Sequence, residues 1–419
     1  MNKIERMLQE LCPNGVEYFL FGEVCEYVRG ITYNKSQEAK TANEDAWRVF
    51  RANNITLSSN TLNYEDIKLV SKSVKVKETQ LLRQGDILIC AGSGSKEHIG
   101  KVAYIPTNMN YTFGGFMAVI RCLKKLNSRY LFHILASEMF SDYLSSVLNS
   151  STINNLNAGI IKNFLIPVPP LPIQEEIVRI LDHFTELAAS LQAELQARKE
   201  QYEYYRNKLL TFDKIGGGTQ SVTWMKMSEL FDIRNGYTPS KANAAYWENG
   251  AIPWFRMEDI RQNGRILSDS IQHITPSAVK GGRLFPANSF IIATTATIGE
   301  HALIIVDSLA NQRFTNLQVR KSLSDKIVVK FLYYYMFIVG EWCKNNTNVS
   351  GFASVDMSKF KKLLIPIPSI SEQQRIVGIL DKFETLVNDL SQGLPAEIAA
   401  VQEQYEYYRD KLLTFKRIA

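Results

Sequence analysis

The most regular pattern in the chain is a series of mostly apolar residues at alternating intervals of four and three. No proline or glycine interrupts residues 173–212, so this heptad spacing predicts one helix of about 60 Å. Pro172 and the PVPP motif before it mark the predicted start. The series consists of Ile177, Leu181, Phe184, Ala188, Leu191, Leu195, Arg198, Tyr202, Tyr205, Leu209 and Phe212.

A second series of the same kind fills the C-terminal segment, but its alternation fails between Leu394 and Ile398. The failure coincides with Gly393–Pro395, where a four-residue insertion and a proline should break or kink a helix. We therefore expect two helical pieces. The series consists of Ile376, Leu380, Phe383, Val387, Leu390, Leu394, Ile398, Val401, Tyr405, Tyr408, Leu412 and Phe415.

The two heptad segments are copies of one another. LIPVPPLPIQEEIVRILDHF at 165–184 aligns with LIPIPSISEQQRIVGILDKF at 364–383. Downstream, QYEYYRNKLLTF at 201–212 matches residues 404–415 at every position but one. A repeat period of about 200 residues indicates two tandem modules rather than a solenoid.

Two matched seams are most simply buried against each other as an antiparallel coiled coil. The blocks that precede the helices would then stand at opposite ends of a dumbbell with an approximate two-fold axis. The alternative is that each helix packs on its own block. The predicted interhelix contacts are Leu181, Phe184, Leu191, Leu195, Tyr202, Tyr205, Leu209, Leu380, Phe383, Leu390, Tyr405, Tyr408 and Leu412.

Residues of the YEYYR repeat that lie off the seam also agree between the copies, and the seam cannot explain them. Their side chains, including Leu210 and Leu413, should point away from the partner helix. A surface displayed twice suits two copies of one partner protein, whereas the alternative is recent duplication or recombination of the gene. The predicted partner contacts are Tyr204, Arg206, Lys208, Tyr407, Arg409 and Lys411.

Short β-branched and aromatic runs, such as DILICAG and SFIIATT, fill the two blocks between turn residues. They predict mixed β-rich domains with a few helices, such as 128–148 and 326–343. GEVCEYVRGIT at 22–32 parallels SELFDIRNGYT at 228–238, so the blocks share a frame. The expected fold class is α+β, with β-rich domains at 1–164 and 214–363 and spacer helices at 165–213 and 364–419.

The net charge of +6 belongs to the blocks rather than to the helices. Residues 1–165 carry 19 Lys and Arg against 15 Asp and Glu, and residues 213–365 carry 18 against 12. Each helical segment is slightly acidic. Excess positive charge on the blocks is expected if they approach a polyanion.

Both blocks carry basic and polar residues in loops at corresponding positions. These residues favour double-stranded DNA as the ligand of the blocks. The loops at 91–101 and 293–301 supply Ser, Thr, His and Lys side chains for phosphates and base edges. The competing interpretation is that they are turn residues and solvated charges. The candidate DNA contacts are Arg29, Arg51, Asn53, Asn54, Ser93, Ser95, Lys96, His98, Lys101, Arg234, Arg256, Thr294, Thr295, Thr297, His301 and Arg313.

Catalytic and metal-binding motifs are missing from the sequence. The five cysteines form no CxxC pair, and the SKEHIGK loop departs from a P-loop at Ser95 and Val102. Glu258–Asp259 is more typical of a helix cap than of a metal site. We expect no catalytic residue, bound metal or cofactor. No segment has the length and apolar composition of a membrane span, and no signal-peptide pattern opens the chain, so we expect a cytoplasmic protein.

The assembled pattern resembles the specificity (S) subunit of type I restriction–modification systems over essentially the whole length. The most specific signals are IPVPPLPIQEEIV and IPIPSISEQQRIV, each opening a helix that ends in YEYYR, and LCPNGVEY at 11–18. The break at Gly393–Pro395 departs from equal spacer halves.

The resemblance implies a non-catalytic DNA-reading subunit in which each block is a target recognition domain for half of a bipartite, asymmetric site. The helices would separate the half-sites and dock two methyltransferase subunits, which bind S-adenosylmethionine and methylate flipped adenines. Restriction/translocase subunits would complete the complex. The rival interpretations are a self-contained restriction or modification enzyme and a coiled-coil adaptor that binds no DNA.

Overall fold

The chain forms two compact units in the computed structural model. Unit 1 comprises Met1–Gln192 with Glu397–Ala419, and unit 2 comprises Ala193–Ala396. Each unit therefore joins one β-rich block to part of both heptad segments, and the long helix α6 (Leu171–Leu209) belongs to both. The structure describes residues 3–39, 46–57, 59–94, 96–148, 155–212, 222–348, 353–389 and 391–418.

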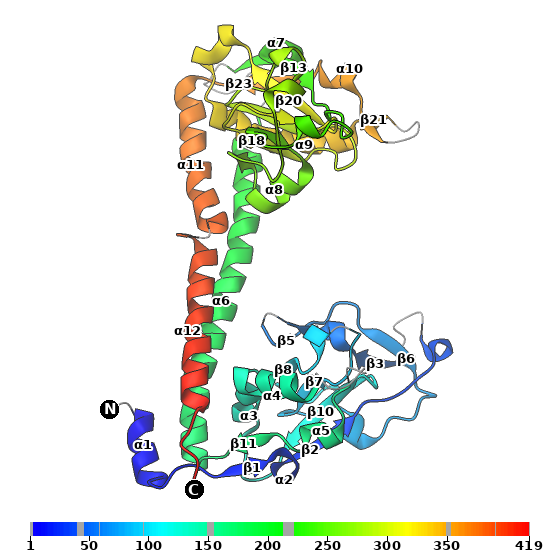
Figure 1. The fold of residues 1–419 in the computed structure, drawn as a ribbon, viewed down its shortest axis with the longest axis vertical. Helices are drawn as coiled ribbons and strands as arrows, with labels where there is room; N and C mark the ends of the chain where they lie inside the picture. Colours follow the sequence, from blue (N-terminus) through cyan, green and yellow to red (C-terminus); the bar gives the residue numbers. More distant parts are fainter. Residues whose placement is uncertain are drawn as a thin grey trace. The chain divides into compact units, whose positions relative to one another are not determined.

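Unit 1 is built on a four-stranded antiparallel sheet in the order β2-β10-β7-β8, with a second sheet, β6-β3-β9, in which β3 and β9 run parallel (Figure 1). Its elements are α1 (Lys3–Leu11), β1 (Tyr18–Leu20), α2 (Phe21–Val24), β2 (Cys25–Arg29), β3 (Ala46–Phe50), β4 (Ile55–Thr56), β5 (Thr61–Leu62), β6 (Lys68–Ser71), β7 (Ile87–Cys90), β8 (Val102–Tyr104), β9 (Tyr111–Phe113), β10 (Met117–Cys122), α3 (Ser128–Leu135), α4 (Glu138–Leu148), α5 (Ala158–Ile161), β11 (Leu165–Pro167), the first part of α6, and most of α12 (Leu394–Leu413).

The central strands of unit 1 are buried on both faces. In β7, Ile87 and Ile89 join a core that also contains α3 and α4 residues, while Leu88 and Cys90 join a second core with Phe50. Side chains alternate between the faces of a strand, so a continuous apolar run such as ILIC marks a strand covered on both sides. The predicted helix at 128–148 is divided into α3 and α4, and between them the Ala136 carbonyl accepts a hydrogen bond from Arg409 (2.8 Å).

Unit 2 repeats this frame with a five-stranded sheet, β13-β20-β17-β18-β15, and a smaller one, β16-β14-β19, in which β14 and β19 run parallel. Helix α9 packs on β17 and β18. The elements are β12 (Thr223–Lys226), α7 (Met227–Leu230), β13 (Phe231–Asn235), β14 (Ile252–Phe255), α8 (Met257–Asn263), β15 (Ile266–Leu267), β16 (His273–Ile274), β17 (Ser289–Ala293), β18 (His301–Ile304), β19 (Leu309–Ala310), β20 (Phe314–Val319), α9 (Val329–Asn345), β21 (Thr347–Asn348), β22 (Ser354–Val355), α10 (Met357–Phe360), β23 (Leu364–Ile367), α11 (Ile370–Asn388) and the last part of α6.

The antiparallel pairing of the heptad segments is confirmed within each unit. In unit 1, Phe184 of α6 stacks on Tyr408 of α12, with ring centres 5.4 Å apart. In unit 2, Tyr205 of α6 stacks on Phe383 of α11 at 5.7 Å, which is the same pair with the two copies exchanged. Leu181 also joins the core of its own block, so the helices pack both on each other and on the blocks.

The seam shifts at the end of the YEYYR repeats. Leu210 and Leu413 are buried, whereas Leu209 and Leu412 are only half-buried. The expectation that Leu210 and Leu413 point outward is therefore wrong; Leu413, for example, belongs to the core of the unit 1 block, which pulls it inward. Leu191 is half-buried and Leu195 is buried, while Leu390 lies outside the described residues.

The predicted break separates α11, which ends at Asn388, from α12, which begins at Leu394. Asp389 Oδ1 accepts the Ser391 N–H (2.8 Å), and the Gly393 N–H donates to the Asp389 carbonyl (3.1 Å). A side-chain carbon at Gly393 would lie 2.4 Å from the Thr385 carbonyl oxygen, so the turn requires glycine. Pro395 is tolerated because it falls in the first turn of α12.

Candidate nucleic-acid interface

A three-residue turn, Gly114–Phe116, joins β9 to β10 in unit 1; we call it the first tip turn. The Ala91 and Gly92 N–H groups both donate to the Phe116 carbonyl (2.8 and 2.9 Å). The Gly114 N–H donates to the Phe50 carbonyl (2.9 Å). The turn is thereby fixed by main-chain bonds to the start of the predicted 91–101 loop and to the end of β3.

The second tip turn, Asn311–Arg313 in unit 2, is held in the same way. The Thr294 N–H donates to the Arg313 carbonyl (2.9 Å), and the Asn311 N–H donates to the Phe255 carbonyl (3.1 Å). These bonds make Arg313 the structural counterpart of Phe116. The two tip turns therefore have the same main-chain hydrogen bonds, but the side chain at this position is Phe116 in one and Arg313 in the other.

Glycines explain why RGIT and NGYT are shared by the blocks. A side-chain carbon at Gly30 would lie 2.2 Å from the Gly114 carbonyl oxygen, and one at Gly236 would lie 2.3 Å from the Asn311 carbonyl oxygen. Only glycine permits that approach. In each block the glycine of the shared motif thus lets its backbone lie directly against the backbone of the tip turn.

Several predicted contacts of unit 1 are partly exposed near its loops but already have partners. Arg51 pairs with Asp66 (2.7 Å), which also accepts from the Asn53 amide (3.2 Å). Arg29 donates to the Leu156 carbonyl (3.3 Å). A phosphate contact by Arg51 stays a prediction.

Two predicted contacts of unit 1 are corrected to structural roles. Asn54 is fully buried and donates to the Asn63 and Glu65 carbonyls (3.1 and 2.8 Å). Lys101 is also buried; its Nζ donates to the Ile55 carbonyl (2.9 Å), and burial lowers its pKa. Polar groups inside a β-rich domain serve its own unpaired carbonyls, which sequence alone does not distinguish from ligand contacts.

The remaining loop residues of unit 1 stay predictions. Ser93 is half-buried, and His98 is half-buried with Nδ1 buried and unpaired among the described residues. Ser95 and the Lys96 side chain lie outside the described residues.

In unit 2, His301 and Thr294 are corrected in the same sense. His301 is buried, its Nδ1 lies 3.1 Å from the Gly299 carbonyl oxygen, and its ring packs edge-on against Phe337 at 4.6 Å. Burial lowers the pKa of His301 to about 3. Thr294 is buried, and its hydroxyl lies 3.2 Å from that of Thr315.

The other predicted contacts of unit 2 are accessible in part. Arg234 lies over the Phe285 ring at 4.8 Å and donates to the Leu284 carbonyl. Arg256 lies over Trp254 at 5.7 Å. Thr295 and Thr297 are half-buried, and Arg313 is exposed.

The acidic pair predicted as a helix cap serves as one. Asp259 is fully buried; its Oδ2 accepts the Arg256 N–H (2.6 Å) and its Oδ1 accepts the Ile271 N–H (2.7 Å). The carboxylate therefore caps the start of α8 and ties down a neighbouring loop.

Buried glutamines that the sequence analysis missed fasten the helices to the blocks. Gln174 accepts the Asn127 N–H (2.8 Å) and donates to the Lys125 and Pro169 carbonyls (3.0 and 2.7 Å). Gln373 repeats the set in unit 2, with the N–H of residue 328 and the carbonyls of residues 326 and 368 (2.8, 3.0 and 2.8 Å). The glutamine shared by PLPIQ and SISEQ was the available signal.

A carboxylate about two turns further along α6 joins this helix to α3. Asp182 accepts from Arg129 (2.7 Å) and lies 2.8 Å from His133 Nε2, while His133 Nδ1 lies 3.0 Å from the Tyr405 hydroxyl. Burial lowers the pKa of His133 against the opposing Asp182 hydrogen bond. Burial also disfavours the charged form of Asp182, but His133 and Arg129 outweigh it and lower the pKa of the carboxyl. A neutral His133 therefore bridges an ionised Asp182 and Tyr405.

Unit 2 places Asp381 of α11 in the corresponding position with different partners. Lys330 lies 2.9 Å from the carboxylate, and the Tyr334 hydroxyl donates to it. The junction is thus repeated in position but not in chemistry.

Of the predicted partner contacts, the tyrosines and lysines face outward and the arginines do not. Tyr204 and Tyr407 are 59% and 60% exposed, and each has a lysine of the next turn, Lys208 or Lys411, 5.6 Å from its ring centre. Arg206 instead lies over Phe337 at 4.2 Å. Arg409 is buried and donates to the Ala136 carbonyl (2.8 Å). Both arginines are corrected to structural roles because a guanidinium reaches the block beside its helix.

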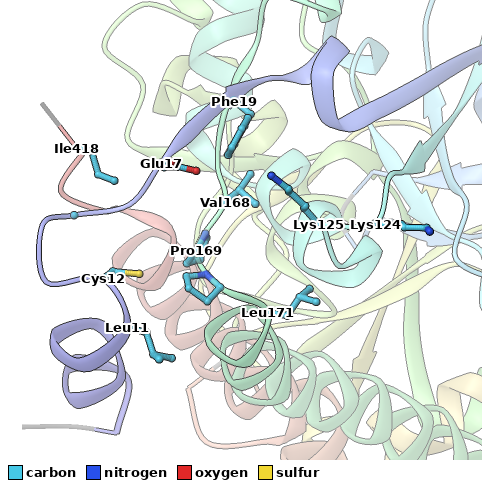
Figure 2. Close-up of a pocket in the computed structure, with 12 residues that line it drawn as sticks. Leu11, Cys12, Glu17, Phe19, Lys124, Lys125, Val168, Pro169, Leu171 and Ile418 are labelled. Carbon is cyan, nitrogen blue, oxygen red and sulfur yellow. The ribbon is translucent and has the colours of Figure 1, made fainter.

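The N- and C-terminal segments of unit 1 meet beside the start of α6. The Val16 N–H donates to the Lys416 carbonyl (2.8 Å), and the Ile418 N–H donates to the Val16 carbonyl (3.1 Å). An adjacent cleft has a volume of about 420 Å³. It is lined by apolar side chains together with Glu17, Lys124 and Lys125 (Figure 2). Lys125 lies 5.6 Å from the Phe19 ring centre. The cleft is mixed in character, and we assign it no ligand.

A family model described as "Type I restriction modification DNA specificity domain" matches residues 13–198 and 221–400. The two matches cover most of the chain and correspond to its two tandem modules. The chain belongs to the specificity-subunit family of type I restriction–modification systems. No helix among the described residues has the length and apolar composition to span a membrane.

Among curated relatives, the chain is 54% identical over 217 residues to the EcoprrI specificity subunit of Escherichia coli, covering 50% of the chain and 54% of that relative. It is 42% identical over 270 residues to the EcoR124I/EcoR124II specificity subunit of Escherichia coli, covering 61% and 64%. The matches thus span between half and two thirds of these two relatives. A putative specificity subunit of Haemophilus influenzae, S.HindORF215P, is 31% identical over 355 residues, covering 79% and 83%.

Two solved structures share the fold. One is a chain from a structure on complex assembly and conformational transition of the type I R-M system, with a TM-score of 0.63 at 19% identity, covering 96% of this chain and 98% of that one. The other is the HsdS subunit from Thermoanaerobacter tengcongensis, with a TM-score of 0.51 at 18% identity, covering 96% and 97%.

Proposed function

We propose that the chain is a non-catalytic subunit that selects a bipartite, asymmetric DNA site, with one half-site read by the β-rich block of each unit. The observation that carries this proposal is the pair of tip turns. Equal main-chain frames present Phe116 in one unit and Arg313 in the other, as expected for one kind of reader directed at two sequences.

Lysines and arginines of the blocks supply the salt-dependent part of DNA affinity, because each phosphate contact releases counterions. Base contacts add about 1–3 kcal/mol for each correctly read base pair. The two half-sites cooperate when their separation matches the protein, since binding of one block raises the effective concentration of the other. The α6 helix contributes to both units, which makes its length the candidate determinant of that separation.

The proposed docking sites for two modification subunits are the outward tyrosine–lysine pairs of the YEYYR repeats. Their equal exposure and equal geometry in the two units support two copies of the same partner. S-adenosylmethionine would be bound by these partners, which methylate adenine, and restriction/translocase subunits would complete the complex. A protein that binds chromosomal DNA in a bacterium acts in the cytoplasm, so we propose this location for the chain.

The proposal is tested with the chain alone and with the chain assembled with modification subunits. The assembled complex should bind duplex DNA with strong salt dependence and should methylate one split sequence, whereas the chain alone should methylate nothing. Methylation by the purified chain would establish the rival enzyme. Absence of salt-dependent binding by the assembled complex would establish the adaptor.

A further inference from the structure

Phe116 is exposed in a way that folding does not explain. Its exposed fraction of 72% is the largest among the large apolar side chains of the described residues. Burying a phenylalanine stabilises a fold by about 1.5–3 kcal/mol relative to leaving it in water, so unit 1 forgoes that stabilisation here.

Main-chain hydrogen bonds fix the backbone of the turn that carries Phe116. Two N–H groups bind its carbonyl, and the Met117 N–H donates to the Gly114 carbonyl (2.8 Å). A side-chain carbon at Gly92 would lie 2.9 Å from the Phe116 ring, so the ring lies against the loop at 91–101. A rigid backbone presents the ring to solvent, and binding would cost little ordering entropy there.

Arg313 occupies the same place in unit 2, and it is also exposed. Its N–H donates to Asn311 Oδ1 (3.0 Å), which stiffens the second tip turn. One position in a repeated frame thus carries an apolar ring in one unit and a guanidinium in the other. These are the two side-chain types that distinguish thymine from guanine in the major groove.

We propose that Phe116 and Arg313 are matched base-reading residues, with Phe116 contacting a thymine 5-methyl group in one half-site and Arg313 contacting guanine O6 and N7 in the other. This inference rests on the proposed function and makes it specific. An aromatic ring gives thymine an apolar partner, whereas arginine offers two parallel donors to guanine. Arg51, near the first tip turn, can contact the adjoining phosphate after releasing Asp66.

The test uses the assembled complex and duplexes in which single thymines are replaced by deoxyuridine, which removes only the 5-methyl group. At one position of one half-site, this replacement should weaken binding about 5-fold or more. With Phe116→Ala the affinity for the thymine duplex should fall similarly, and the same replacement should then have no effect. Replacement of single guanines by 7-deazaguanine tests Arg313 and Arg313→Ala in the same way.

Phe116→Arg should also move the preference at that one position from T·A toward G·C, as read by methylation mapping. Leu123→Ala is the matched control, because Leu123 is 44% exposed just past the other end of β10. It should leave all affinities unchanged. The deoxyuridine scan of the unaltered complex requires no variant, so a folding defect cannot obscure the result.

Two negative results have different meanings. If the complex binds one split sequence but no thymine responds to removal of its methyl group, the role of Phe116 is refuted and the proposed function stands. If the complex has no sequence preference at all, the proposed function itself fails.

Discussion

Substitution of Gln174 should loosen the junction between α6 and α3. Its amide is fully buried and makes three hydrogen bonds, of 2.8 and 3.0 Å to the Asn127 N–H and the Lys125 carbonyl just before α3, and of 2.7 Å to the Pro169 carbonyl just before α6. Gln174→Leu keeps most of the side-chain volume but leaves one N–H and two carbonyls without partners. At about 1 kcal/mol for each lost bond, the expected cost is about 3 kcal/mol.

The cost should be visible as local opening, because the Asn127 N–H is one of the lost donors and the Asn127 side chain caps α3. Hydrogen exchange read by mass spectrometry should show about 100-fold lower protection for the α3 amides, since each 1.4 kcal/mol corresponds to a factor of about ten. Amides of α9 should keep their protection. Gln373→Leu should reverse the pattern.

Protection of α3 that stays within about twofold of the parent would show that the amide bonds do not hold the junction. Equal loosening of α3 and α9 by either variant would show that the two junctions are coupled. That result would contradict the expectation that the Gln174 and Gln373 hydrogen bonds act separately. Gln196→Leu, at an exposed position of α6, is the control and should change neither helix.

Three further predictions concern acid stability, docking and spacing. Burial holds His301 neutral with a pKa of about 3, and an unfolded imidazole protonates near pH 6.5; its stabilising contribution is therefore complete above about pH 6.5 and is lost as pH falls toward 3. The free energy of unfolding of unit 2, measured in urea, should fall more steeply between pH 6.5 and pH 3 for the parent than for His301→Gln. An equal dependence of this free energy on pH in the two proteins would contradict the prediction. Tyr204→Ala and Tyr407→Ala should each remove one modification subunit in native mass spectrometry, whereas Ile271→Ala, an exposed control in unit 2, should remove none; full occupancy in the double variant would reject the docking site. One heptad inserted after Gln192 should change the gap between recognised half-sites but not their sequences, and methylation maps with an unchanged gap would reject α6 as the spacer.

The helices were predictable because their pattern is long and redundant. The seam of α6, its antiparallel pairs and the break before Leu394 all follow from spacing and from Gly393. The rotation that buries Leu210 and Leu413 did not follow, because a heptad pattern contains no information on the block that packs beside the helix.

The candidate site was predictable only as a set of loops. Residue type placed the contacts in the 91–101 and 293–301 segments, but it could not tell Lys101, bound to a buried carbonyl, from a lysine available to a phosphate. Phe116 was missed because an apolar residue between two apolar strands predicts core. The glycines of FGGF were the one local sign of a turn at that point.

The main-chain seating of the tip turns has a consequence for how such proteins change. Each turn is secured through carbonyl and N–H groups and a close backbone contact at a glycine, none of which depends on the side chain at residue 116 or 313. A mutation at either position can therefore alter the outward chemistry with little penalty in fold stability. New preferences are open to selection one substitution at a time, and each unit can diverge without waiting for the other.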